Sequence, residues 1–158
     1  MPLPRSVLRM TPDELESFLQ RERTLRLGTV SPDGEPHVAP LWFVWNVGTM
    51  YFNSLKRSRR GRDLEHGSRV AACVDAGHEY GELHGAVLYG TLEPVTDPEV
   101  SARVRKLFGE KYWNGMDIPE VRSHQWFSMR PDEIVSWDFK KIPPGRDRRL
   151  EATDTKQR

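Results

Sequence analysis

The sequence has little of what marks a secreted, membrane-bound or disulfide-stabilised protein. Its 158 residues include one cysteine, Cys73, so no disulfide can form within the chain and a reducing compartment is favoured. The first thirty residues carry charges throughout and lack the apolar segment of a signal peptide. No apolar run approaches the ~20 residues that cross a bilayer. We therefore expect a cytoplasmic protein that makes no membrane contact.

An excess of either charge is also missing. The chain has 24 Lys and Arg against 23 Asp and Glu, which gives no reason to expect general affinity for nucleic acid. The five histidines are scattered, with no pair at helical i,i+4 spacing and no set of cysteine partners, so we predict no metal site. No Gly-x-Ser-x-Gly elbow, Walker loop or Rossmann fingerprint occurs. The sequence therefore identifies no catalytic residues.

What the sequence does contain is a series of short strand patterns with two helices beside them. A capping box at residues 11–14 predicts a short helix, and Asp97-Pro98 begins a second, predicted over residues 97–109. A loop carrying Tyr112 and Trp113 is predicted over residues 111–123. The strand patterns cover residues 25–30, 36–45, 50–55, 69–75, 83–95, 125–129 and 134–139.

These patterns predict one domain over residues 1–158, with an ordered core at about 10–142 and a polar tail at 143–158. The domain is mainly β, a small antiparallel barrel of six or seven strands with peripheral helices. Within the long strand pattern at residues 83–95, Gly85 and Gly90 indicate bulges or barrel bends.

A basic run at residues 56–62 is the most informative local feature. It carries five cationic side chains, the hydroxyl of Ser58 and one glycine, and it lies between a strand pattern and a short helix predicted from Asp63. Such a run, with the free N–H groups of a helix start, suits a phosphate. A solvated charged surface is the plain alternative. A nucleic-acid module is disfavoured because Tyr51 and Phe52 precede the run and no aromatic residue lies within it.

The order of the motifs resembles that of the pyridoxamine 5′-phosphate oxidase-like split-barrel flavoproteins. The matching stretches are residues 27–30, 33–38, 40–43, 51–64 and 69–72, and the resemblance covers residues 12–140. It implies a homodimer of split barrels with FMN, or the deazaflavin coenzyme F-420, in a groove where the two subunits meet. For the subunit interface, apolar surface is expected from Trp42, Phe43, Trp45 and Trp126.

The same resemblance implies the cofactor-binding residues. Ser58, Arg59 and Arg60 match the stretch that holds the cofactor phosphate, and Arg57 matches a cationic position of the F-420 branch. The strand residues matching the walls of the site are Asn53 and Ser54 at one strand end, and Pro40, Leu41, Trp42 and Phe43 beside the flavin ring.

The chain departs from the oxidase that names the family. That enzyme ends in an Arg-Leu-x-Pro segment that grips pyridoxal, whereas this chain has Ser136-Trp137-Asp138-Phe139, similar to small members of the F-420 branch. Vitamin B6 oxidation is therefore not expected. Five cations in the basic run exceed what the single phosphate of FMN needs, which favours F-420, with its phosphodiester and glutamate tail, over FMN.

The resemblance thus implies an oxidoreductase that transfers a hydride between reduced F-420, or FMN, and a small planar unsaturated substrate. In such an enzyme the cofactor supplies the chemistry, which is consistent with the missing catalytic constellation. A non-catalytic carrier or sensor of F-420, FMN or haem is the alternative, and it would share every site residue. The sequence leaves the substrate and the direction of the reaction open.

Overall fold

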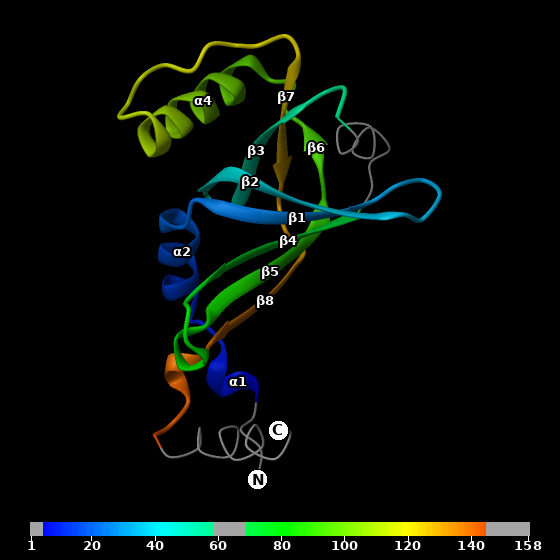
Figure 1. Ribbon diagram of the computed structural model, residues 1–158. Helices are drawn as coiled ribbons and strands as arrows, with labels where there is room; N and C mark the ends of the chain where they lie inside the picture. Colours follow the sequence, from blue (N-terminus) through cyan, green and yellow to red (C-terminus); the bar gives the residue numbers. More distant parts are fainter. Residues whose placement is uncertain (1–4, 59–68, 145–158) are drawn as a thin grey trace.

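The computed structural model describes residues 5–58 and 69–144 (Figure 1). The helices are α1 (Arg5–Leu8), α2 (Pro12–Arg21) and α4 (Pro98–Tyr112), with short 3-10 turns η1 (Tyr80–Glu82) and η2 (Phe139–Lys141). The strands are β1 (Thr24–Val30), β2 (Pro36–Asn46), β3 (Thr49–Leu55), β4 (Arg69–Ala76), β5 (His84–Thr91), β6 (Glu93–Pro94), β7 (His124–Met129) and β8 (Glu133–Asp138). No helix in this part of the chain is long and apolar enough to span a bilayer.

The eight strands in the described residues form one curled antiparallel sheet in the order β6-β7-β3-β2-β1-β4-β5-β8. Strand β2 joins its two halves, because residues 36–42 pair with β1 and residues 43–46 pair with β3. This arrangement confirms the predicted antiparallel split barrel with peripheral helices. The assignment of all 158 residues to one domain stays a prediction.

The core fills the inside of the curl. Alternate residues of β1 point inward, so Leu25 and Leu27 are fully buried while Arg26 between them is exposed. Helix α2 covers one end of the core with Phe18 and Leu19. The predicted capping box is confirmed, since the Thr11 N–H donates to Glu14 Oε2 at 2.7 Å and the Glu14 N–H donates to Thr11 Oγ1 at 3.3 Å.

The single long strand predicted over residues 83–95 is wrong. The segment forms β5, which pairs with β4 and β8, and then β6, which pairs with β7 in the other half of the sheet. The chain changes halves at Leu92, whose side chain is 3% exposed. An alternating apolar pattern continues through this change of partner, which is why the sequence predicted one strand fewer.

Of the bulges or barrel bends predicted at Gly85 and Gly90, the bulges are wrong. Strand β5 pairs residue for residue with β4 along its whole length, including Asp75 with Gly85 and Val70 with Gly90. A Cβ at Gly85 would lie 2.6 Å from the carbonyl oxygen of Val74. Glycine therefore allows close approach of the neighbouring strand at this position, with no irregularity in the pairing.

Helix α4 runs three residues past the predicted end at Gly109, so Lys111 and Tyr112 are helical and not part of a loop. It lies against the half of the sheet that holds β3, β6 and β7 (Figure 1). A second apolar cluster, formed by Val44, Tyr51, Val104, Phe108 and Trp126, joins helix and sheet. Glycine is needed at position 109 because a Cβ there would lie 2.2 Å from the carbonyl oxygen of Met116.

Candidate functional site

The predicted site residues on β2 and β3 meet where these two strands part. The β2–β3 pairing runs from the turn up to Phe43 opposite Phe52 and ends there. Beyond that pair, β3 continues through Leu55 beside β7, while β2 runs beside β1. We call residues 40–43 and 53–58 the β2–β3 fork. The fold thus brings together two groups of residues that the sequence singled out separately.

Strand alternation divides the predicted ring-contacting residues into two pairs. Pro40 is exposed and Trp42 is 46% exposed, so both face outward. Leu41 packs against the core and Phe43 is fully buried in it. Any contact of these two residues with a ligand on the outer face would therefore come from their backbone.

On β3, Asn53 and Ser54 likewise point to opposite faces of the strand. Ser54 is 2% exposed and follows the inward-facing Met50 and Phe52 at period two. The Oδ1 atom of Asn53 is buried and accepts no hydrogen bond from any residue in the described ranges. A buried acceptor without a donor costs about 1–3 kcal/mol, so a ligand N–H or O–H at this strand end would be favoured there.

Only the beginning of the basic run lies in the described residues. The Ser58 hydroxyl and the Ser58 N–H both donate to the carbonyl oxygen of Leu55, at 2.8 and 3.2 Å, which forms a turn directly after β3. The Lys56 N–H donates to the carbonyl oxygen of Ser123 at 3.0 Å and ties this turn to the start of β7. Arg59, Arg60 and the helix predicted from Asp63 lie outside the described residues, as does most of the polar tail, so their roles stay predictions.

The outward side chain of Trp42 belongs to an aromatic cluster that sequence reasoning missed. Its ring lies 4.5 Å from that of Tyr112 with 11° between the planes, and 5.4 Å from that of Trp113 at 73°. The guanidinium of Arg23 lies 4.7 Å from the centre of the Tyr112 ring. A helical spacing of four from Phe108 to Tyr112 was the available signal, and Gly109 obscured it by suggesting a helix end.

Hydrogen bonds hold Tyr112 against the sheet. Its hydroxyl donates to the carbonyl oxygens of Arg23 and Phe43, both at 2.6 Å, and accepts from the Phe43 N–H at 3.1 Å. Burial raises the pKa of the Tyr112 hydroxyl to about 12. The hydroxyl is therefore a structural donor at neutral pH, and the ring beneath Trp42 is fixed in position.

Lys111, on the same helical turn, is a cation in a largely apolar setting. Its Nζ lies 4.5 Å from the centre of the Phe43 ring and donates to the carbonyl oxygen of Glu22 at 2.5 Å. Burial, together with repulsion from Arg23, lowers the pKa of Lys111 to about 8. The end of α4 is thus attached to the chain that enters β1.

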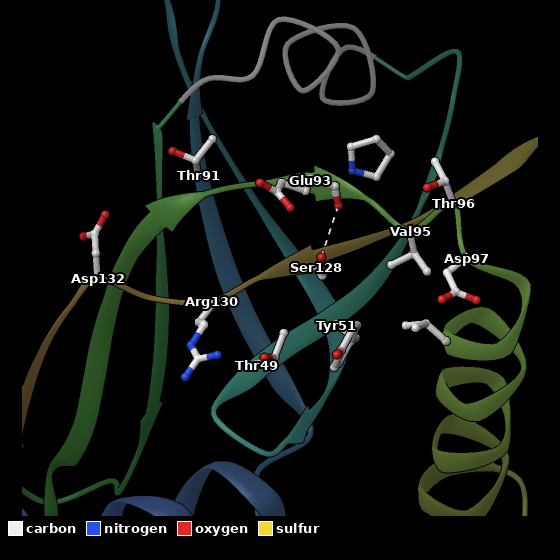
Figure 2. A pocket seen from close by; sticks show the side chains of 12 residues that line it. Thr49, Tyr51, Thr91, Glu93, Val95, Thr96, Asp97, Ser128, Arg130 and Asp132 are labelled. Atoms are coloured by element: carbon white, nitrogen blue, oxygen red, sulfur yellow. Dashed lines mark hydrogen bonds between the residues drawn. The ribbon is translucent and has the colours of Figure 1, made fainter.

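A cleft of about 610 Å³ lies elsewhere, between the outer face of β3, β6 and β7 and the start of α4 (Figure 2). None of the predicted cofactor-binding residues in the described ranges lines it. Among those same residues, no three histidine, cysteine or acidic side chains lie close enough together to hold a metal ion.

Comparison with known proteins identifies the family. The model of the pyridoxamine 5′-phosphate oxidase family matches residues 11–138, which is most of the chain and includes both arms of the β2–β3 fork. The chain belongs to the pyridoxamine 5′-phosphate oxidase family. Proteins of this family bind flavin cofactors. None of the curated proteins compared with the chain matches it in sequence.

Solved structures of several other proteins share its fold. A conserved hypothetical protein, Rv2991 from Mycobacterium tuberculosis, has a TM-score of 0.79 and 24% identity, covering 89% of this chain and 92% of the other. An F420 reductase has a TM-score of 0.61 and 25% identity, covering 79% and 98%. HutZ, a heme storage protein from Vibrio cholerae, has a TM-score of 0.68 and 20% identity, covering 80% and 94%. This fold therefore occurs in proteins with more than one function.

Proposed function

We propose that this protein is an oxidoreductase that transfers a hydride between reduced F-420, or FMN, and a small planar unsaturated substrate. The observation that carries the proposal is the β2–β3 fork. There the outward Pro40 and Trp42, the unsatisfied Oδ1 of Asn53 and the start of the basic run lie around one strand divergence in a flavin-binding family. The similarity to an F420 reductase over 98% of that chain adds support.

Each described residue of the fork has a distinct proposed role. Pro40 and Trp42 would pack against the cofactor ring, and a small rotation of the Asn53 amide would let Oδ1 accept from a cofactor N–H or O–H. Arg57 and Ser58, with Arg59 and Arg60, would hold the phosphate. When bound, the cofactor supplies the hydride, so no side chain has to act as a strong acid or base.

The cofactor we favour is F-420. The run of residues 56–62 carries more cations than one FMN phosphate can use, whereas F-420 also presents a carboxylate-rich tail. FMN is the alternative.

We also propose that the protein is a homodimer that uses the outer face of the sheet half formed by β1, β2, β4, β5 and β8. Three of the four residues expected at the interface, Phe43, Trp45 and Trp126, are at most 8% exposed within one chain and are not available for it. The outer face instead presents small and apolar residues from neighbouring strands: Gly28, Val38, Pro40, Ala71, Cys73, Val87 and Val135. Val38 is 67% exposed and Val135 is 47% exposed.

A second copy fits this surface because the surface is apolar at its centre and has paired charges around it. Arg26 on β1 pairs with Asp75 on β4, and Arg69 on β4 pairs with Asp132, which directly precedes β8. No described element of the chain covers the patch. Since Pro40 belongs to both the patch and the fork, the partner would lie beside the cofactor and help to enclose it.

The direct test is to purify the protein from a host that makes both cofactors and to record the visible spectrum and mass of the ligand that copurifies. Reduced F-420 or FMN bound to the protein should then be reoxidised by planar unsaturated acceptors, faster than the free cofactor. A bound cofactor that no acceptor of this class reoxidises faster than free cofactor would support the alternative, a carrier or sensor. A protein that binds neither F-420 nor FMN would refute the proposed oxidoreductase, and one that also binds no haem would refute the alternative.

A further inference from the structure

The cleft in Figure 2 has a polar floor made by three neighbouring strands. Tyr51 on β3, Ser128 on β7 and Glu93 on β6 lie side by side, since Ser128 pairs with both of the others. One step further along, Thr49 and Arg130 follow the pair of Met50 and Met129. The walls are Thr91 and Asp132 on one side and residues 94–97 with Val100 on the other.

Two oppositely charged side chains line this cleft without forming an ion pair with each other. Glu93 and Arg130 form no salt bridge or side-chain hydrogen bond with any residue of the described ranges. They lie on neighbouring segments, because Glu93 on β6 pairs with Ser128 and Arg130 comes two residues after Ser128, just past the end of β7. The other two carboxylates are engaged: Asp97 accepts from the Glu99 N–H at the start of α4, and Asp132 makes two bonds of 2.6 Å to Arg69.

Hydroxyl groups supply most of the remaining polar surface. The side chains of Thr49, Tyr51, Thr91 and Thr96 make no hydrogen bond within the described part of the chain, although Tyr51 is only 8% exposed. The Ser128 hydroxyl lies 3.5 Å from the carbonyl oxygen of Glu93. A ligand in the cleft would therefore meet donors and acceptors along its length as well as one charge of each sign.

We propose that this cleft binds a zwitterion of dipeptide size, with its ammonium group at Glu93 and its carboxylate at Arg130. The free ends of an extended dipeptide are roughly 7 Å apart, so both can lie within the cleft that Glu93 and Arg130 line. A guanidinium binds a carboxylate through two parallel hydrogen bonds, and the hydroxyls suit a peptide group. The volume lies in the range of small-molecule sites.

The composition of the lining argues against other ligand classes. A phosphate or an oligoglutamate tail would meet Glu93, Asp97 and Asp132 as well as Arg130, so the anionic parts of F-420 are disfavoured here. An apolar ligand would leave the hydroxyls and both charges unpaired. The proposal does not depend on the cofactor site, because no predicted cofactor-binding residue of the described chain lines this cleft.

The test uses the full chain and alanylalanine as the probe in isothermal titration calorimetry, with N-acetylated, C-amidated and doubly blocked forms of the same dipeptide. We expect the free dipeptide to bind in the millimolar range or tighter. Arg130→Gln should weaken binding of the free dipeptide about tenfold but leave binding of the C-amidated form unchanged. Glu93→Gln should likewise weaken binding of the free dipeptide about tenfold but leave binding of the N-acetylated form unchanged. The exposed helix substitutions Lys106→Gln and Glu110→Gln are the controls and should have no effect.

Three results would overturn the proposal. One is that the parent protein binds the free dipeptide no better than the doubly blocked form at millimolar concentration. Another is that the two control substitutions reduce binding as much as the two cleft substitutions. The third is that F-420 or FMN displaces the dipeptide competitively, which would assign the cleft to the cofactor.

Discussion

The ring of Trp42 lies flat on the ring of Tyr112, with centroids 4.5 Å apart and planes at 11°. This stack joins β2 at the proposed cofactor site to the last turn of α4. The Tyr112 hydroxyl fixes the lower ring through the carbonyl oxygens of Arg23 and Phe43. The orientation of an outward site residue therefore depends on a helix end remote from it in sequence.

Removing the hydroxyl of Tyr112 should lower stability while leaving the stack in place. Tyr112→Phe removes the hydrogen bonds of the hydroxyl to the backbone of Arg23 and Phe43, and we expect a loss of about 1–3 kcal/mol in the free energy of unfolding by urea. Tyr80→Phe is the control, because Tyr80 is 50% exposed and should change by less than about 0.5 kcal/mol. Equal effects of the two substitutions would contradict the role of the Tyr112 hydroxyl.

Removing the ring of Tyr112 should affect ligand binding as well. Tyr112→Ala takes away the support beneath Trp42, so we expect the affinity for F-420 or FMN, measured by fluorescence titration, to fall several-fold. Tyr112→Phe should retain most of that affinity because it keeps the aromatic ring. If Tyr112→Ala remains folded and binds the cofactor like the parent, the stack has no part in the site.

The environment of Lys111 predicts a rise of stability with pH. Its pKa is about 8 in the folded protein against 10.5 for the free side chain, so the unfolded chain binds more protons between these values. The contribution of Lys111 to the free energy of unfolding is therefore fully present above pH 10.5 and is lost as the pH falls through 8. Because the side chain is partly exposed, we expect a screened effect on the order of 1 kcal/mol.

Comparison with Lys111→Met isolates this effect from other groups. The raised pKa of Tyr112 acts in the opposite direction above pH 10, because the folded protein keeps a proton that the unfolded chain loses. The difference in unfolding free energy between parent and Lys111→Met cancels that contribution. As the pH rises from 8 to 10.5, the free energy of unfolding of the parent should increase relative to that of Lys111→Met. A difference that is constant with pH would contradict burial of Lys111.

In helix α4, glycine should be more stabilising than alanine at position 109, whereas alanine should be more stabilising than glycine at position 102. Gly109→Ala would normally stabilise a helix by about 1 kcal/mol, but here the added Cβ would lie 2.2 Å from the Met116 carbonyl oxygen. We expect a loss of about 1–3 kcal/mol by thermal or urea unfolding. Ala102→Gly, at an exposed position of the same helix, should lose about 1 kcal/mol from helix propensity alone. Stabilisation by Gly109→Ala would disprove the close approach.

A charge on the outer face of the sheet should break the proposed dimer. The parent should have about twice the chain mass in light scattering at micromolar concentration, whereas Val38→Glu and Val135→Glu should be monomeric and bind cofactor more weakly. The control, Val121→Glu, introduces the same charge at a residue that is 45% exposed but lies outside the sheet. A parent protein that is monomeric with cofactor bound would exclude this arrangement.

The sequence predicted local structure well where the signal is local. The alternation in β1 and the capping box at Thr11 depend on neighbouring residues, and both are present. Predictions failed where a distant contact decides the outcome. Leu92 marks the change from one half of the sheet to the other, and Gly109 continues a helix because a later loop packs against it.

In the candidate site, too, local features could be predicted and long-range contacts could not. The resemblance selected Pro40, Trp42 and Asn53, which the fold brings to one fork, but it could not separate them from the inward-facing Leu41, Phe43 and Ser54. The support from Tyr112 and Lys111 was missed because it comes from a helix whose contacts with β2 are long-range. Side-chain direction and tertiary support therefore required the structure.

If the basic run and the β2–β3 fork bind F-420, its affinity should depend strongly on salt concentration. The affinities of the parent for F-420 and FMN would be measured by fluorescence titration over a range of salt concentrations. F-420 should bind more tightly, and its affinity should fall more steeply with salt, because its tail adds exposed ion pairs that salt screens. The double substitution Arg57→Gln/Arg59→Gln should reduce the difference between F-420 and FMN in how steeply affinity falls with salt. Equal salt dependences for the two cofactors, or tighter binding of FMN across the whole range, would rule out F-420 as the preferred ligand and make FMN the working cofactor.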